Sequence, residues 1–279
     1  MIPAVRAEMR KIATTRAWWL NAILFFGYML FIAAIMAFSF VFAMHEAERT
    51  GNMPDSSGGL GTGATLMDPG TIALSVYTLA VALGYIFPAV LGALAVTTEF
   101  RHRTITPTLL AEPRRSLVLG AKLVAVLPFA LVVAVAGVAG TVVGGAVTMA
   151  IMGEPTMLGD GEVQRTVLLS VVALVLWALV GVGFGSVLTN QVAAIVVLLA
   201  FTQFLEPILR LLLSQFDATE QLSRFLPGAA GEAVAGSSLY ASSGLADLLS
   251  AWQGALVLLG YAVVLVLIGR FTTFRRDIG

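Results

Sequence analysis

The sequence predicts an all-α integral membrane protein with six transmembrane helices, and three features of the whole chain support this fold class. Hydrophobic residues make up 58% of the 279 residues and charged residues only 11%, whereas a soluble domain has about 25% charged residues. The mean hydropathy is +0.94. Several uncharged stretches also reach the roughly 20 residues that a helix needs to cross a bilayer. A soluble globule of this composition would lack the polar side chains to cover its surface.

The segment before the first long apolar stretch has the pattern of an amphipathic helix over residues 2–16. Val5, Met9 and Ile12 recur at intervals of three and four residues, and basic residues such as Arg16 occupy other positions. Such a helix lies along a membrane interface with its apolar side toward the lipid. The alternative is a solvated basic segment that only sets the topology.

Uncharged stretches place the six spans. The longest, from Thr166 to Leu205, has about twice the length of one span, so we divide it at the polar cluster Thr189-Asn190-Gln191. The first apolar run is too long for the core of a signal peptide, which has roughly 7 to 15 apolar residues. The expected spans are about 18–44, 72–96, 120–152, 166–188, 191–206 and 248–270.

Glycine and proline mark special positions inside the spans. Gly140 with Gly144, and Gly181 with Gly185, form pairs that allow two helix backbones to approach closely. Packing within the bundle is the expected use, and a dimer seam is the alternative. Pro88 predicts a kink in the second span, because proline lacks the N–H of a helix hydrogen bond.

Basic residues concentrate on one side of the spans. Twelve of the sixteen basic residues, but only four of the sixteen acidic ones, fall in the N-terminal segment, the loop at 97–122, the turn at Asn190 and the tail from Arg270. Lys and Arg concentrate in cytoplasmic loops. We therefore expect both termini and the 97–122 loop in the cytoplasm.

The loop that follows the second span mixes apolar residues among charges. Ile105, Leu109 and Leu110 are spaced for one side of a short helix, and Pro113 is a natural stop. A cytoplasmic helix of this kind would expose its apolar side chains unless a partner or the membrane surface covered them. The loop therefore predicts a docking surface.

The order of residues in this loop resembles that of the permease subunits of type 2 ATP-binding-cassette (ABC) exporters. Similar motifs follow along the chain: the N-terminal segment with Lys11 and Arg16, Asn190-Gln191, Leu226-Pro227-Gly228-Ala229 and a tail like that of actinobacterial members. Pro107 departs from the pattern, where Thr or Ser is more usual. The loop motif consists of Glu99-Phe100, Arg101 to Arg103, Thr104-Ile105, Leu109-Leu110, Pro113, Arg114-Arg115 and Lys122.

This resemblance implies a coupling helix within the 97–119 loop, two copies of a separate ABC ATPase subunit, and a second permease subunit that is identical or related. ATP and Mg²⁺ would bind the ATPase, and this chain would lie in the cytoplasmic membrane of a bacterium in contact with lipid and not with nucleic acid. Interfacial contacts would come from Val5, Met9, Ile12 and Arg16. The expected ATPase-docking residues are Glu99, Phe100, Arg101, Arg103, Thr104, Ile105, Leu109, Leu110, Arg114 and Arg115.

The sequence carries no catalytic or cofactor signature. Neither lysine follows a glycine as a phosphate-binding loop requires, so the chain is expected to bind no ATP and to be no enzyme. It has no cysteine. His45 and His102 fall on opposite sides of the membrane by the predicted topology, and we therefore expect no metal site.

In the resembled family, spans one, two and five line the substrate path, and outer segments cap it. We carry this over as an aromatic path for a hydrophobic or amphiphilic substrate, such as a drug, a lipid-like molecule or a peptide, and as an outer re-entrant segment at 207–227. The expected path residues are Phe25, Tyr28, Tyr77, Tyr85, Phe201, Gln203, Phe204 and Glu206.

Two other function classes stay open at this point. An ion-coupled carrier or channel needs an ionisable residue in the membrane, and the borderline case is Glu206 at the outer end of span five. Glu206 either guards an exit or forms an interfacial ion pair with Arg210, four residues on. A membrane scaffold or sensor that moves nothing would also use the docking loop.

Overall fold

The computed structural model describes residues 1–50, 68–214, 221–237 and 248–274. Within these ranges the chain is helical and has no strand. Six of the described helical segments are long and apolar enough to cross a membrane, which confirms the predicted fold class. These segments are Ala17–Thr50, Pro69–Arg101, Arg115–Ile151, Gly161–Val187, Gln191–Leu213 and Ala251–Phe271.

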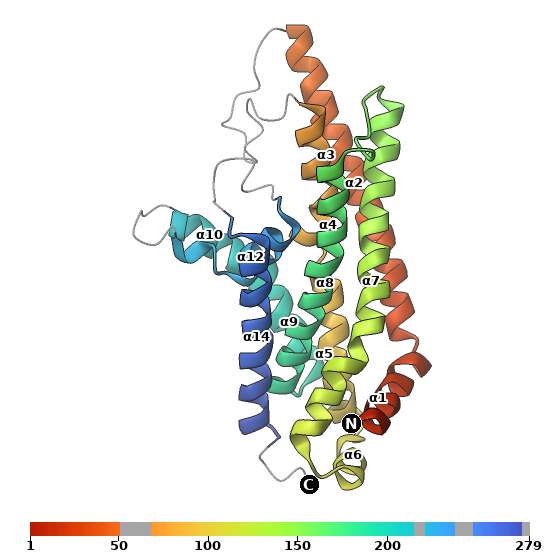
Figure 1. Cartoon of the computed structure of the whole chain (residues 1–279), viewed down its shortest axis with the longest axis vertical. Coiled ribbons are helices and arrows are strands. Elements are labelled where there is room, and N and C mark those ends of the chain that lie inside the picture. The colour runs from red at the N-terminus through yellow and green to blue at the C-terminus, as the bar shows by residue number, and fades with distance from the viewer. Residues whose placement is uncertain (51–67, 215–220, 238–247, 275–279) are drawn as a thin grey trace.

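The two longest helices, α2 (Ala17–Thr50) and α7 (Arg115–Ile151), run side by side along the whole bundle (Figure 1). Their close approach depends on small residues. A Cβ atom at Gly140 or Gly144 of α7 would clash with the carbonyl oxygen of Phe26 or Leu30 in α2. This glycine pair therefore packs inside the bundle, as expected, and does not form a dimer seam.

The second span is interrupted. It consists of α3 (Pro69–Tyr77), α4 (Leu79–Ala82) and α5 (Ile86–Arg101). We predicted a kink at Pro88, but the break lies one turn earlier and Pro88 sits in the first turn of α5. Because Pro88 has no N–H for the Gly84 carbonyl, the N–H of Phe87 donates to it instead, at 3.1 Å.

Helix α8 (Gly161–Val187) lies at the centre of the bundle, between α5 and α14 (Ala251–Phe271) (Figure 1). Asp160 caps its start by accepting from the N–H groups of Glu162 and Val163 at 2.8 and 3.2 Å. Gly181 and Gly185 lie against the backbone of α5, so the second glycine pair also packs within the bundle.

The fifth segment bends at a π-helical turn. Helix α9 (Gln191–Ala200) begins at Asn190, whose side chain accepts from the N–H of Ala193 at 3.1 Å. One π-helical turn, η2 (Phe201–Leu205), then leads into α10 (Glu206–Ser214), which projects sideways from the bundle (Figure 1). Helix α12 (Pro227–Ala235) returns the chain toward α8 and α14. The predicted outer segment 207–227 thus includes most of α10, while its residues 215–220 lie outside the described residues.

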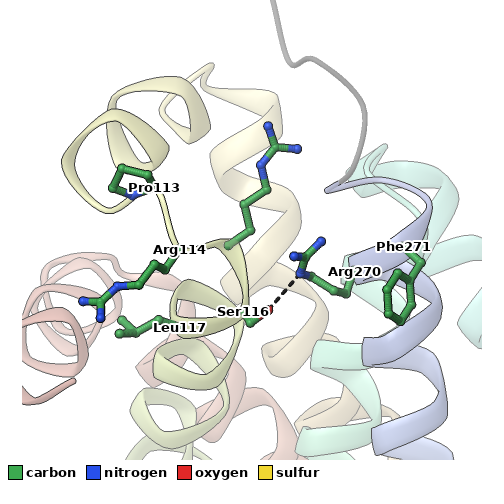
Figure 2. A pocket seen from close by; sticks show the side chains of 7 residues that line it. Pro113, Arg114, Ser116, Leu117, Arg270 and Phe271 are labelled. Atoms are coloured by element: carbon green, nitrogen blue, oxygen red, sulfur yellow. Dashed lines mark hydrogen bonds between the residues drawn. The ribbon is translucent and has the colours of Figure 1, made fainter.

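Most of the described basic residues gather at one end of the bundle, which we call the basic end. It holds α1 (Ile2–Thr14), α6 (Ile105–Ala111), the start of α7 and the end of α14 (Figure 1). There Arg270 of α14 donates to the Ser116 hydroxyl of α7 at 2.9 Å (Figure 2). His102 lies at this end and His45 at the other, where it pairs with Glu154 at 2.8 Å. The two histidines are therefore separated, as predicted.

Candidate functional site at the basic end

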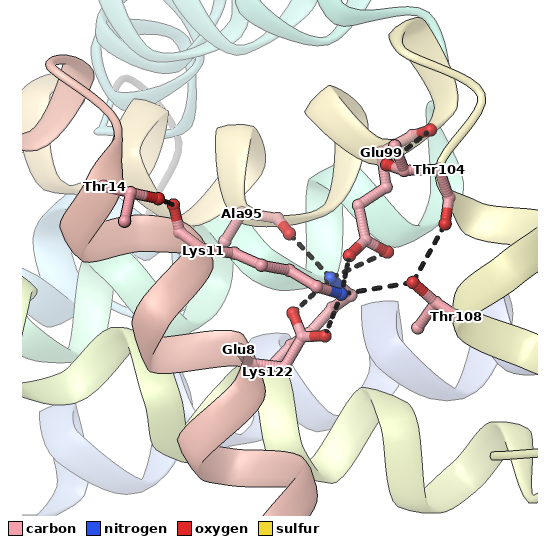
Figure 3. A network of polar contacts seen from close by, with 8 residues as sticks. All are labelled: Glu8, Lys11, Thr14, Ala95, Glu99, Thr104, Thr108 and Lys122. Carbon is pink, nitrogen blue, oxygen red and sulfur yellow. Dashed lines mark hydrogen bonds and ion pairs between the residues drawn. The ribbon is translucent and has the colours of Figure 1, made fainter. Parts of the chain in front are cut away.

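Four charged side chains form a buried cluster at the basic end, which we call the ion cluster: Glu8, Lys11, Glu99 and Lys122 (Figure 3). The Nζ atom of Lys11 lies 2.6 Å from Glu8 Oε1 and 2.5 Å from Glu99 Oε1. The Nζ atom of Lys122 lies 2.7 Å from Glu8 Oε2 and 3.0 Å from Glu99 Oε2. Each carboxylate thus contacts both ammonium groups, and the cluster joins α1, α5 and α7.

The most deeply buried member of the cluster is Lys122, whose side chain is 1% exposed. Its third polar contact is the Ala95 carbonyl at 2.9 Å. Lys122 thus donates hydrogen bonds to Glu8 and to the Ala95 carbonyl, and its contact with Glu99 is an ion pair. A buried charge is tolerated only when it is paired and hydrogen-bonded. The position of α1 against the bundle is therefore fixed by charge as well as by apolar packing.

Lys11 lies at the edge of the ion cluster and connects it to α6. Its side chain is 42% exposed, and Nζ also donates to the Thr108 hydroxyl of α6 at 3.1 Å. Burial lowers the pKa of Lys11, but the carboxylates of Glu8 and Glu99 outweigh it and the pKa is raised above 10.5. Because the folded pKa is raised, the stabilisation is fully present at neutral pH and is lost only above about 10.5.

The link between α5 and α6 is short and constrained. Arg103 has a φ of 55°, a left-handed conformation that ends α5. The N–H of Thr104 donates back to the Glu99 carbonyl at 2.9 Å. Helix α6 begins at the next residue, and Pro107 falls in its first turn, where no N–H is needed. The departure at Pro107 is therefore compatible with a regular helix.

The three apolar residues of α6 do not share one exposed side. Ile105 is 2% exposed and belongs to the core, and Leu109 packs partly against it. Leu110 is 79% exposed. We predicted that all three, together with Glu99, would contact a partner. The structure instead buries Ile105 in the apolar core and Glu99 in the ion cluster. Both residues therefore help to hold α6 in place.

The other predicted docking residues lie near α6 and differ in their exposure and contacts. Arg103 and Thr104 are exposed, and Arg101 is exposed with Nη1 donating to Gln191 Oε1 at 3.1 Å. Phe100 packs edge to face on Phe274 at 5.7 Å. The remaining contacts are those of Arg114 with Glu112 at 2.8 Å and of Arg115 with the Phe274 carbonyl.

The predicted amphipathic helix forms as α1, and Val5, Met9 and Ile12 are half-buried on it, whereas Arg16 is exposed beyond its end. Its contact with the membrane interface stays a prediction. A groove of about 510 Å³ separates α1 from α6, and Ala7, Thr104 and Pro107 contribute to its lining. The basic end thus presents an exposed short helix beside an open groove.

A second buried charge cluster joins α10 to α12, and we call it the α10–α12 cluster: Glu206, Arg210 and Glu232. Arg210 Nη2 lies 3.0 Å from Glu206 Oε1, which confirms the expected pair, and Nη1 lies 2.9 Å from Glu232 Oε1. Glu206 Oε1 also accepts from the N–H groups of Gly228 and Ala229 at 2.5 and 3.2 Å, at the start of α12. All three side chains are buried, not interfacial.

Glu232 was not predicted from the sequence. A signal was present, because Glu232 is the one charge in a helix of glycine, alanine, valine and proline, and an isolated charge in such a helix needs a partner.

The residues predicted to line a substrate path are not gathered at one place. Phe25, Tyr77 and Tyr85 are buried in the core. Phe25 stacks on Phe87, and Tyr85 stacks on Trp177 and donates to the Thr202 carbonyl at 2.8 Å. The others differ in exposure: Tyr28 is 39% and Phe204 70% exposed, Phe201 and Gln203 are half-buried, and Glu206 is buried.

The six apolar helices are those of a multi-pass membrane protein. At its basic end, the ion cluster holds α1, α5 and α7 together beside α6. Comparisons with models of known protein families and with curated proteins find no match for this chain. Within the described ranges, no group of three or more His, Cys, Asp or Glu side chains is placed to hold a metal ion.

Proposed function

We propose that this chain is the membrane-spanning permease subunit of an ATP-driven exporter of the type 2 ABC class. The observation that carries the proposal is α6, a helix outside the spans whose Leu110 is 79% exposed, while Ile105 is buried and Leu109 packs partly against the core. The order of residues around it resembles the coupling loop of that class. An exposed leucine on a helix that is linked to α1 through Thr108 and to α5 through a short turn suits a partner that exerts force.

The proposed partner is an ABC ATPase, present in two copies, which binds ATP and Mg²⁺. A second permease subunit, identical or related, completes the exporter. The basic end faces the cytoplasm of a bacterium, in agreement with the concentration of Lys and Arg there. The proposed substrate is hydrophobic or amphiphilic.

The ion cluster supplies a physical route for the coupling. A displacement of α6 acts on Lys11 through Thr108 and on Glu99 through the short link at Arg103. Separating the buried Lys122 from Glu8 and Glu99 costs several kcal/mol, so α1 and α7 follow α5 when α5 moves with α6. The docking surface then consists of Leu110 and the exposed Arg101, Arg103 and Thr104, while Ile105 and Glu99 transmit force.

The ion-coupled carrier is the less favoured function. It relied on Glu206 as an ionisable group in the membrane, but this carboxylate pairs with Arg210 and accepts from the start of α12. Its partners are therefore an arginine of the same helix and two backbone N–H groups of α12. Its geometry favours a structural role.

Changing Leu110 to Asp is expected to weaken binding of the ATPase about 10- to 100-fold, because the change removes a buried leucine from the interface, worth roughly 1.5 to 3 kcal/mol. The measurement is co-purification of the two subunits from detergent, followed by binding of the purified pair. The matched control is Leu158→Asp, an exposed leucine at the opposite end. Binding unchanged by Leu110→Asp would place the docking surface elsewhere.

The orientation can be tested separately, because the chain has no cysteine of its own. A cysteine at Gly159, exposed between α7 and α8, is expected to react with an impermeant thiol reagent added to intact cells. A cysteine at Thr106, exposed on α6, should react only after the membrane is opened. The reverse pattern would show that the basic end faces outward.

A further inference from the structure

A cavity of about 940 Å³ opens at the basic end between the start of α7 and the end of α14 (Figure 2). The docking surface proposed above does not include this cavity. It lies at the level where two neighbouring spans reach the end of the bundle, so it is placed to receive a molecule from the adjacent lipid layer. The cavity is lined by Pro113, Arg114, Arg115, Ser116, Leu117, Arg270 and Phe271.

The lining carries three arginines and no carboxylate. Arg114 is compensated by Glu112, at 2.8 and 3.0 Å. Arg270 uses Nε to donate to Ser116, and no carboxylate of the described residues forms an ion pair with it. A guanidinium has five N–H donors, so Arg270 can also donate to a bound anion. Among the described residues, the charge of Arg270 is therefore the one that remains for an anion in the cavity.

Apolar side chains border the same cavity. Phe271 lines it beside Arg270 and is 62% exposed, and Leu117 lines it from α7. One turn back along α14, Leu267 is 49% exposed. A free inorganic anion would use the arginines but leave these side chains in water. A cationic site with an apolar border fits an amphiphile with an anionic headgroup.

We propose that this cavity binds the phosphate headgroup of an anionic phospholipid from the leaflet on the basic side. Basic pockets between transmembrane helices recognise lipid headgroups in this way. The start of α7 adds to the attraction, because the N–H groups at a helix N-terminus favour an anion. The bound lipid would hold α14 against α7. This inference requires the cavity to lie at the membrane surface but does not depend on an ATPase partner.

The test measures lipid retention by the full-length protein in detergent, using native mass spectrometry with phosphatidylglycerol and phosphatidylcholine as probes. Phosphatidylglycerol is expected to be retained in preference to the zwitterionic lipid and to raise the Tm. Arg270→Gln should weaken its binding about fivefold, on the basis of the contribution of one basic residue near a membrane surface. Glutamine can still donate to Ser116, so the variant keeps the local hydrogen bond.

The matched control is Arg10→Gln, which removes an exposed charge at the same end but outside the cavity. It should leave phosphatidylglycerol retention unchanged. An equal loss in both variants would reduce the effect to general surface charge and overturn the proposal. A Tm increase of the same size with inorganic phosphate alone would show a free anion site in place of a lipid site. Phe271→Ser supplies the converse check, because it should weaken retention of the lipid while leaving all three arginines in place.

Discussion

Replacing Lys122 with Met is expected to lower the free energy of unfolding by about 3 to 5 kcal/mol, the usual effect of removing one partner from a buried ion pair. The change removes an ammonium that lies 2.7 Å from Glu8 and 3.0 Å from Glu99. Both carboxylates would then depend on Lys11 alone. Methionine has a similar length and flexibility, so little of the loss comes from packing. Unfolding of the purified protein in detergent gives the measurement.

Two further variants separate charge from shape. Lys11→Met should cost about 1 kcal/mol or less, because Lys11 is half-exposed and water can compensate its partners. Adding Glu8→Gln and Glu99→Gln to Lys122→Met should recover much of the stability, because no buried charge is then left without a partner. A loss under about 1 kcal/mol for Lys122→Met would mean that water reaches the ion cluster and that it cannot transmit force.

Replacing Arg210 with Met is expected to destabilise the protein by a similar amount, about 3 to 5 kcal/mol. This guanidinium bridges Glu206 on α10 and Glu232 on α12, and all three side chains are buried. Without it the two carboxylates would repel each other across the contact between the helices. The structural consequence is that α10 and α12 separate, which hydrogen exchange of the α12 amides would detect as faster exchange.

The control for Arg210 is Arg165→Gln, an exposed arginine at the start of α8 whose loss should change stability by less than about 0.5 kcal/mol. Glu232→Gln in the Arg210→Met background should restore part of the stability, because it removes one of the two repelling charges. If Arg210→Met unfolds at the temperature of the unaltered protein, the α10–α12 cluster is solvated in detergent and does not hold these helices.

The positions of the spans could be predicted from local sequence, because the hydropathy of about 20 consecutive residues depends only on that stretch of chain. The same holds for α1, for the turn at Asn190 and for the short helix α6 within the 97–119 loop. The break in span two was predicted one turn too late, since proline is acceptable in the first turn of a new helix and the sequence alone does not tell a kink from a helix start. The Glu206–Arg210 pair could be predicted from the sequence, because its members are four residues apart on one helix.

What the sequence by itself determined is an all-helical membrane protein with six candidate spans and an uneven distribution of charge. The tertiary structure alone decided which charges meet. Lys122 is 114 residues from Glu8, and Arg210 is 22 residues from Glu232. It also turned Ile105 inward and left Leu110 exposed, although both belong to the same apolar pattern. Periodicity describes neighbours on one helix, whereas these contacts form where α1, α5 and α7, or α10 and α12, are brought together by packing in the folded bundle.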